Sequence, residues 1–218
     1  LLDVARTVLG GVAADRVRGI GLSTQRATAV VWETATGTPV HRAISWQDHR
    51  TQARCQALMA EGVLVSPLTA ASKIEWILDR VDPDRSAVNA GRLRCGTLDA
   101  WIVWRLSGGR IDATDGSHAS CSGFHDLFTN TWAPVVTDAL RVPVRALPTI
   151  VDSSAVLGTL DPALGLPPLP LAATIGDQQA AMRRRDDRVA QFHSLPSLSI
   201  ATGGHSEEPM RSFIHPAR

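Results

Sequence analysis

The sequence predicts an α/β domain over residues 1–182, followed by a tail of different character at 183–218. Three observations favour this fold class. Apolar residues recur at helical spacing in several segments, short β-rich apolar runs alternate with those segments, and Gly or Pro residues separate them. Alternating helices and short buried strands are typical of α/β domains. With 218 residues, 44% of them hydrophobic, the chain can bury a substantial core.

The first sixty residues are expected to contain two helices around a group of short strands. In order, the patterns predict an amphipathic helix over the first dozen residues, strands at 17–23 and 28–32, a turn at 36–39 and a short strand at 40–45. Asp48 is the predicted N-cap of a helix that runs to about Ala60.

The following segments predict three more helices and one more strand. An apolar stripe predicts a helix at 71–81, which Asp82 and Pro83 end. A helix is expected after Thr97, with the glycine pair at 108–109 as its stop, and another at 132–140. The apolar run at 171–175 should be a buried strand that ends at Gly176 and Asp177.

The tail at 183–218 has no clear period and is rich in Arg, Ser, Pro and His. We expect it to be a loop, disordered, the start of a second lobe, or sequence foreign to the preceding domain. A shifted reading frame would also produce this mixture. Because the chain has no initiator Met and opens inside a predicted helix, we expect it to be a fragment.

Composition excludes several classes of function. With 22 basic and 21 acidic residues, the chain carries no broad field for nucleic acid or an anionic membrane, so a charged ligand must be held locally. No run approaches the roughly 20 apolar residues of a membrane span. The three cysteines lack CxxC spacing, which favours a reduced, cytoplasmic setting over a disulfide framework or a zinc site.

Asp177 is the first candidate for chemistry. A carboxylate directly after a buried strand lies where α/β proteins place ligands, and there it can accept a proton from a substrate hydroxyl. Gln178 can hydrogen-bond a neighbouring hydroxyl. The structural alternative, that Asp177 only caps a helix starting at Gln178, is favoured by local spacing alone.

Arg26 and Trp46 are further candidates. Arg26 follows a strand and offers five donors in a fixed fork, suited to a hydroxyl-rich or anionic ligand, although a surface arginine on a hairpin loop is about as common. Trp46 could form an apolar wall against the carbon face of a ligand. Taken alone, Trp46 is better explained as a packed core residue.

Two other patterns favour structure over function. Asp112, Asp115 and His118 resemble a metal cluster by composition, but their spacing matches no zinc or EF-hand template, so a turn is expected and no metal is predicted. The glycine pair at 203–204 could approach a phosphate, but an isolated pair is weak support for a phosphate site.

Six motifs in one order carry a more specific signal than any residue alone. They are GLSTQRAT at 21–28, SWQDHRT at 45–51, KIEWILD at 73–79, GTLDAW at 96–101, TDGSHAS at 114–120 and GDQQAA at 176–181. Together they closely resemble the amino-terminal half of the FGGY carbohydrate kinases, the glycerol kinase branch in particular, over about residues 17–182.

The resemblance implies a ribonuclease H-like domain of the actin and hexokinase type, with a mixed sheet, flanking helices and one part missing. This domain would be the first of two lobes that close around ATP, Mg²⁺ and a polyol or sugar. By the same resemblance, Asp177 is the catalytic base, Arg26 and Gln178 bind substrate hydroxyls, and Trp46 lines the pocket. Phosphoryl transfer needs mainly such alignment and charge neutralisation. The resemblance also allows a homo-oligomeric parent enzyme.

The chain departs from the family pattern at its pocket and at its ends. Ala27 stands where glycerol kinases carry Glu, and Leu68 where they carry a pocket Tyr, so we expect the parent enzyme to prefer another polyol or a ketose. The family's first hairpin and its adenosine-binding lobe lie outside residues 1–218. We therefore expect this chain alone not to turn over ATP; a non-catalytic, polyol-binding relic of the same fold is the alternative.

Overall fold

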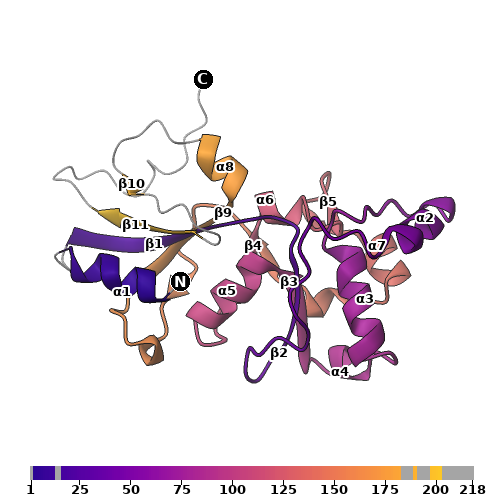
Figure 1. The fold of residues 1–218 in the computed structure, drawn as a ribbon, viewed down its shortest axis with the longest axis horizontal. Coiled ribbons are helices and arrows are strands. Elements are labelled where there is room, and N and C mark those ends of the chain that lie inside the picture. Colours follow the sequence, from indigo (N-terminus) through magenta and orange to yellow (C-terminus); the bar gives the residue numbers. More distant parts are fainter. Residues whose placement is uncertain (1, 13–15, 183–188, 191–196, 203–218) are drawn as a thin grey trace.

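Two parallel strands, β1 (Val17–Thr24) and β9 (Pro170–Gly176), form the centre of a five-stranded sheet. The computed structural model describes residues 2–12, 16–182, 189–190 and 197–202. Because the two strands run parallel, their carboxyl ends lie together at one edge of the sheet (Figure 1). The last register pair of the two strands is Thr24 opposite Gly176.

The outer strands of this sheet run antiparallel to the central pair. β11 (Ser197–Thr202) pairs with β1, β10 (Val189–Ala190) pairs with β11, and β8 (Gly158–Thr159) pairs with β9. The sheet is therefore mixed. Strands β10 and β11 lie in the tail, where the sequence analysis assigned no regular structure; the remainder of the tail lies outside the described residues.

Helices α1 (Leu2–Gly10) and α5 (Leu98–Leu106) bury apolar side chains against this sheet. Figure 1 shows α1 running along β1, and α5 between this sheet and the rest of the molecule. Ala5 of α1, Ile20 of β1 and Val103 of α5 belong to one buried apolar cluster. Burial of such a cluster is the main favourable term in folding.

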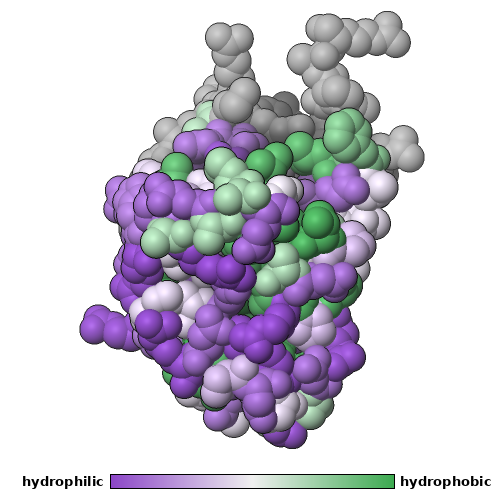
Figure 2. Space-filling model, turned by 90° about the vertical axis from the view of Figure 1, so that its right-hand side faces the viewer, coloured by the Kyte–Doolittle hydropathy of each residue, from purple (hydrophilic) through white to green (hydrophobic). Residues whose placement is uncertain are grey.

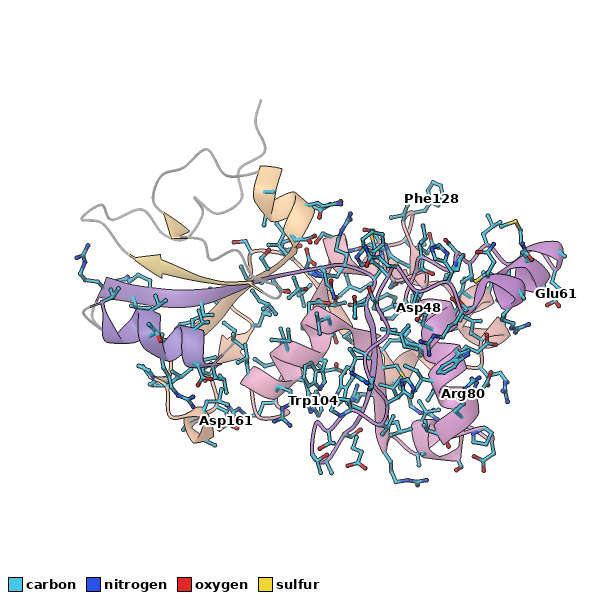
Figure 3. All side chains as sticks on the ribbon, viewed as in Figure 1. Asp48, Glu61, Arg80, Trp104, Phe128 and Asp161 are labelled. Atoms are coloured by element: carbon cyan, nitrogen blue, oxygen red, sulfur yellow. The ribbon has the colours of Figure 1, made fainter. Side chains whose placement is uncertain are left out.

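An antiparallel pair, β2 (Ala29–Glu33) and β3 (Leu93–Thr97), separates two cores. Because side chains alternate along a strand, Val30 and Trp32 pack toward Ala100 and Trp104 of α5. Val31 on the opposite face joins the larger core that contains α3 (Ala71–Val81). Trp104 lies between α5 and the β2 turn, as Figure 3 shows.

The remaining elements are short and surround these cores. They are α2 (Gln52–Ala60), α4 (Ser86–Asn89), α6 (Gly116–Ala119), α7 (Pro134–Ala139), α8 (Asp177–Met182), two 3₁₀ turns at Val144–Ala146 and Pro162–Leu164, the parallel pair β4 (Ala113–Asp115) and β7 (Thr149–Val151), and the antiparallel pair β5 (His125–Asp126) and β6 (Thr131–Trp132). None of the very short elements is signalled by periodicity, which needs a longer window.

Several predicted elements are confirmed with close boundaries. The helix predicted at 71–81 is α3, the helix after Thr97 is α5, and the strands at 17–23, 28–32 and 171–175 are β1, β2 and β9. The helix over the first dozen residues is α1. Each of these segments buries a continuous apolar face, so the spacing of apolar residues along the sequence predicts the element.

Asp48 is not the N-cap of α2, which begins after Thr51. The Asp48 carboxylate instead accepts hydrogen bonds from the backbone N–H, Nε and Nη2 of Arg50, at 2.9, 2.9 and 2.7 Å. This local ring of bonds holds the chain in a turn, so the helix starts later; Figure 3 shows Asp48 on this loop. The bonds and charge of Arg50 lower the pKa of Asp48 to about 2.

Two other predicted elements are shorter than expected. The strand predicted at 40–45 is reduced to isolated bridges, which join Ala29 to Ile44 and Trp32 to Pro39. The helix predicted at 132–140 begins only at Pro134, because Trp132 pairs with His125 across β5 and β6. Tertiary pairing overrides the local pattern in this second segment.

The surface mixes polar and apolar side chains. The end that carries α2 and α7 faces the viewer in Figure 2, and its hydrophobic side chains lie among hydrophilic ones. Phe128 is fully exposed and projects from the β5–β6 connection, as Figure 3 shows. Among the described residues no helix has the length and apolar character needed to cross a membrane. Cys55, Cys95 and Cys121 are all free thiols.

Candidate functional site

Arg26 and Gln178 meet where β1 and β9 end. The chain leaves the sheet after Thr24 and after Gly176, which are register partners, so the next residues of both strands emerge side by side. Nη2 of Arg26 donates a hydrogen bond to Oε1 of Gln178. The Arg26 side chain also lies over Gly176, where an added Cβ would lie 2.5 Å from Cδ of Arg26. The glycine therefore makes room for the arginine.

Asp177 is half-buried at the start of α8 and uses one oxygen for the backbone. Its Oδ1 accepts a 2.8 Å hydrogen bond from the N–H of Gln178, the next residue. Because α8 already includes Asp177, this is a local bond in the first turn and not the N-cap bond to a helix starting at Gln178 that local spacing favours. Within the part of the chain that the structure describes, no group donates to Oδ2. One carboxylate oxygen is thus free to accept a proton, so the local bond to Gln178 and the chemical role are compatible.

Gln179 belongs to the same site and received no role in the sequence analysis. Its Oε1 is buried and has no hydrogen-bond partner among the described residues. This oxygen lies close to Arg26, because a Cβ at Gly176 would lie 2.6 Å from it. A buried acceptor without a donor is costly, and a ligand hydroxyl could satisfy it. Only the tertiary structure distinguishes Gln179 from its neighbour Gln178.

Trp46 lies on the surface loop before α2, with 42% of its area exposed, so its interpretation as a packed core residue is wrong. The side chain of Lys73 on α3 anchors this loop, because its Nζ donates to the carbonyl oxygens of Trp46 and Thr69, both at 3.3 Å. Burial lowers the pKa of Lys73 to about 8. Across the described residues, no hydrogen bond or ring contact joins Trp46 to Arg26 or Asp177.

The two pocket residues that depart from the family pattern lie in different environments. Ala27, next to Arg26, is buried and has a left-handed backbone with φ of 58°. This conformation costs a non-glycine residue about 1 kcal/mol. Leu68 is 45% exposed. Neither side chain can hydrogen-bond a hydroxyl.

The acidic and histidine side chains at 112–118 separate into two groups. Asp112 forms an ion pair and a hydrogen bond with Arg94. Burial raises the pKa of Asp112, and the charge and hydrogen bond of Arg94 oppose that rise. Asp115 and His118 are fully buried and lie with Asp99, a residue that the sequence analysis did not select. Asp115 accepts bonds from the N–H groups of Ser117 and His118, so it caps α6, as the turn interpretation predicts.

This buried group does not suit a magnesium ion that must reach a nucleotide. Asp99, Asp115 and His118 have a ligand atom each within 4.8 Å of one another, but all three are fully buried. Their carboxylates already accept bonds from protein hydroxyls: Thr97 at 2.5 Å and Thr114 at 2.7 Å on Asp99, and Ser153 at 2.6 Å on Asp115. Mg²⁺ keeps several waters and needs an open site.

Arg26, Asp177 and Gln178 form a wall at the surface, in which Gln178 is exposed and the other two are half-buried. Two hollows, of about 400 Å³ and about 10 Å³, are lined by other residues. The larger one is lined by Val30, Pro39, His41, Arg42, Ala43 and Trp101.

Comparison with known proteins supports a kinase relationship over most of the chain. Residues 2–182 match the FGGY family of carbohydrate kinases, N-terminal domain. The glycerol kinase of Rhodospirillum centenum is 41% identical over 192 residues, which cover 83% of this chain and 39% of the relative. The glycerol kinase of Bradyrhizobium sp. (strain ORS 278) is 42% identical over 181 residues, which cover 78% of this chain and 36% of the relative. The chain thus spans less than half the length of these relatives.

Solved structures show the same fold at lower sequence identity. Plasmodium falciparum glycerol kinase with ADP superposes with a TM-score of 0.75 at 18% identity, covering 93% of this chain and 50% of that one. Xylulose kinase from Rhodospirillum rubrum gives a TM-score of 0.69 at 20% identity, covering 92% and 51%. These matches confirm the predicted fold class, a mixed sheet with flanking helices that forms part of a sugar-kinase fold.

Proposed function

Because the chain belongs to the FGGY family of carbohydrate kinases, we propose that it supplies the substrate-binding part of an enzyme that phosphorylates a hydroxyl of a polyol or sugar with ATP. The observation that carries this proposal is the contact between Arg26 and Gln178 beside the carboxylate of Asp177, at the common end of β1 and β9. Ligands of α/β proteins bind at this edge of the sheet.

In the proposed reaction, Asp177 is the base. As the substrate oxygen forms its bond to the transferred phosphorus, the O–H bond breaks and Oδ2 of Asp177 takes the proton, while the nucleoside diphosphate leaves. This role needs a carboxylate oxygen without a protein donor. Oδ2 meets that need among the described residues, whereas Oδ1 is occupied by the N–H of Gln178.

Arg26, Gln178 and Trp46 would bind and orient the substrate. The guanidinium and the amide already share a hydrogen bond, so a polyol could bridge or replace it with its own hydroxyls. The buried Oε1 of Gln179 offers a further acceptor. The exposed indole of Trp46 could cover the carbon face of the substrate.

ATP and Mg²⁺ would be held mainly by parts of the parent enzyme beyond this chain. The carboxylate cluster of the described residues is closed and does not fit the metal, and the glycine pair at 203–204 lies outside the described residues. We therefore propose that residues 1–218 bind substrate but do not transfer phosphate alone. The position of Arg26, Asp177 and Gln178 at the surface is consistent with a site that a second lobe of the enzyme completes.

The chemistry of the wall favours a substrate other than glycerol. Ala27 and Leu68 cannot pair with substrate hydroxyls, so a glycerol site of the family type would lose two partners. A site that lacks hydrogen-bonding groups binds the corresponding ligand more weakly. We propose a longer polyol or a ketose, which has additional hydroxyls for Arg26, Gln178 and Gln179.

Calorimetric titration of the chain with glycerol, ribitol, xylitol and D-xylulose tests the binding proposal. We expect one of the larger ligands to bind more tightly than glycerol, and Arg26→Ala to weaken that binding by about tenfold or more. Arg105→Ala is the matched control, since the guanidinium of Arg105 donates to the carbonyl of Thr36 in the β2 turn and has no other hydrogen-bond partner among the described residues. Binding by none of the four ligands, or equal loss in both variants, would count against the proposal.

The catalytic proposal needs the full-length parent enzyme. Asp177→Asn should lower kcat by about a thousandfold or more with little change in substrate affinity, because Asn cannot take the proton. Asp138→Asn is the control, since Asp138 is exposed on α7. Retention of kcat in Asp177→Asn would remove Asp177 from the base role. Glycerol as the best substrate of the parent would contradict the substrate class.

A further inference from the structure

A buried imidazole lies between two carboxylates beneath the candidate site. Nδ1 of His118 is 2.6 Å from Oδ1 of Asp115 and 3.5 Å from Oδ2 of Asp99, and Nε2 is 2.8 Å from Oγ1 of Thr24. None of these four side chains takes part in the proposed proton transfer. His118, Asp99, Asp115 and Thr24 each have 0% of their surface exposed.

The surroundings of His118 favour its doubly protonated form. Burial acts to lower the pKa of His118, but the charges of Asp99 and Asp115 and the hydrogen bond to Asp115 outweigh it, so the pKa lies above its ordinary value. The titratable groups that face the ring are Asp99 from α5 and Asp115 from the end of β4; β1 contributes the neutral hydroxyl of Thr24. As an imidazolium, His118 donates from Nδ1 to Asp115 and from Nε2 to Thr24.

The same short helix also holds the second central strand. Oγ of Ser117 donates to Oδ1 of Asp115 at 2.9 Å and accepts a 2.8 Å hydrogen bond from the N–H of Gly176. Gly176 and Thr24 are register partners at the ends of β9 and β1. Asp115 therefore orients two adjacent side chains of α6: His118, which contacts Thr24 at the end of β1, and Ser117, which contacts Gly176 at the end of β9.

We propose that His118 is a positioning residue of the substrate site: through Thr24 it fixes the end of β1, while its neighbour Ser117 fixes the end of β9, and together they keep Arg26 in contact with Gln178 beside Asp177. The distance along the chain supports this role. Thr24 is two residues from Arg26, and Gly176 directly precedes Asp177. The inference deepens the proposed function, because it explains how that same site keeps its shape.

Hydrogen exchange of the full chain, followed by NMR, tests this proposal without any ligand. In Ser117→Ala, the Gly176 amide loses its acceptor and should exchange about tenfold faster, and Ser117→Thr should restore slow exchange. His118→Gln should produce the same local increase at the ends of β1 and β9. Ile77→Val, a truncation in the core around α3, is the control for general destabilisation.

A second measurement addresses the charge of the ring. Long-range ¹H–¹⁵N spectra at neutral pH should contain one imidazole with both nitrogens protonated, and this signal should be missing from His118→Gln. A neutral ring at this position would contradict the charge assigned to His118, and the exchange rates would then test the positioning role by themselves. A His118→Gln variant whose amides exchange faster throughout the molecule, as in Ile77→Val, with no excess at the strand ends, would overturn the proposal. If His118→Gln does not fold, the Gly176 exchange rates of Ser117→Ala and Ser117→Thr test the proposal, and the wild-type imidazole spectrum tests the charge of His118.

Ligand titration separates this inference from the proposed function. Where the wild-type chain binds a polyol or D-xylulose, Ser117→Ala and His118→Gln should weaken that binding by about tenfold, and Ser117→Thr should recover it. If the wild-type chain binds none of these ligands, the proposed function fails, while the exchange experiment still decides whether His118 and Ser117 position the strand ends.

Discussion

Arg26 donates a hydrogen bond to Gln178 across 152 residues of sequence. The two residues come from different strands, and they meet because β1 and β9 are parallel neighbours that end at the same register position. Parallel strands bring their carboxyl ends to one edge, where loop side chains can converge. The contact therefore depends on the register of the sheet, and changes at the strand ends should alter binding more than stability.

Gly176→Ala tests this separation of binding from stability. The new Cβ would lie 2.5 Å from Cδ of Arg26 and 2.6 Å from Oε1 of Gln179, so both side chains must move. Cδ lies in the middle of the Arg26 side chain and Oε1 at the end of Gln179. Because both side chains are flexible and only half-buried, we expect Gly176→Ala to lower the free energy of unfolding by about 1 kcal/mol. Binding of the preferred polyol or ketose should weaken by about tenfold, measured by calorimetry.

Gly10→Ala is the control for that experiment, since a Cβ at Gly10 meets nothing within 4 Å. It should leave binding unchanged, while the urea midpoint stays the same or rises slightly, because alanine favours a helix more than glycine does. Unaltered binding in Gly176→Ala would show that the position of Arg26 does not matter for the ligand.

Ala27→Glu should restore affinity for glycerol. Ala27 already has the left-handed φ of 58°, so exchange for another L-residue adds no new backbone strain. A carboxylate beside Arg26 can accept a hydrogen bond from a substrate hydroxyl, which contributes about 1.5–3 kcal/mol. Titration with glycerol should therefore show at least about a tenfold gain. Ala27→Gln, which is similar in size but uncharged, should give a smaller gain, and equal gains would argue against a charge effect.

Lys73 should give the protein an unusual alkaline stability profile. Its pKa in the fold is about 8, below the ordinary value of 10.5, so the unfolded chain binds more protons between these pH values. Stability therefore rises as the pH increases through this window, on the order of 2 kcal/mol, and the cost of burying the charge is fully present below pH 8. Lys73→Met removes this dependence.

Urea titrations at pH 7, 8, 9 and 10 measure the Lys73 effect as the difference between wild type and Lys73→Met. The difference cancels other groups, such as Cys95, whose pKa burial raises. Lys73 is the one lysine of the sequence, so no second lysine contributes to the window. Parallel profiles for the two proteins would show that Lys73 keeps an ordinary pKa.

Asp115 should contribute to acid stability. Burial acts to raise its pKa, but bonds and charge from His118 and bonds from Ser153 and Ser117 hold it below the ordinary value. A lowered carboxyl pKa contributes stability that is present above about pH 4 and is lost as the pH falls below it. Asp115→Asn should cost about 2–4 kcal/mol at pH 7, because it leaves His118 charged and buried without its nearest partner.

The acid profile separates this effect from ordinary cavity or packing changes. Between pH 5 and pH 2, Asp115→Asn should lose less stability than the wild type, measured by urea unfolding at each pH. Asp138→Asn, which changes an exposed carboxylate on α7, should follow the wild-type profile. A wild-type slope in Asp115→Asn would mean that this carboxyl does not titrate differently in the fold.

Sequence patterns predict the long elements well because their burial is periodic. The helix at 71–81 and the strands at 17–23 and 171–175 each present apolar residues at the spacing of their own geometry. The short elements carry no such period, and α6 is one example. Its four residues form one turn, held by the carboxylate of Asp115 rather than by an apolar face.

The candidate site was predictable only in part. Asp177, Gln178 and Arg26 follow strands, and position after a strand is visible in the sequence. Asp99 and Gln179 were missed, since burial of a polar group and the loss of its partner depend on what packs around it. The roles of Asp177, Arg26, Gln178 and Trp46 stay predictions that the experiments above address.

The amino-acid sequence by itself determined the α/β class, the family resemblance and the chemical types available at the end of each strand, because these depend on residue order and spacing. The tertiary structure alone decided that β1 and β9 are adjacent, that Arg26 reaches Gln178, and that His118 sits between two buried carboxylates. The physical reason is that strand pairing and the burial of charge are long-range: each arises from residues far apart in the chain, and no local window contains both partners.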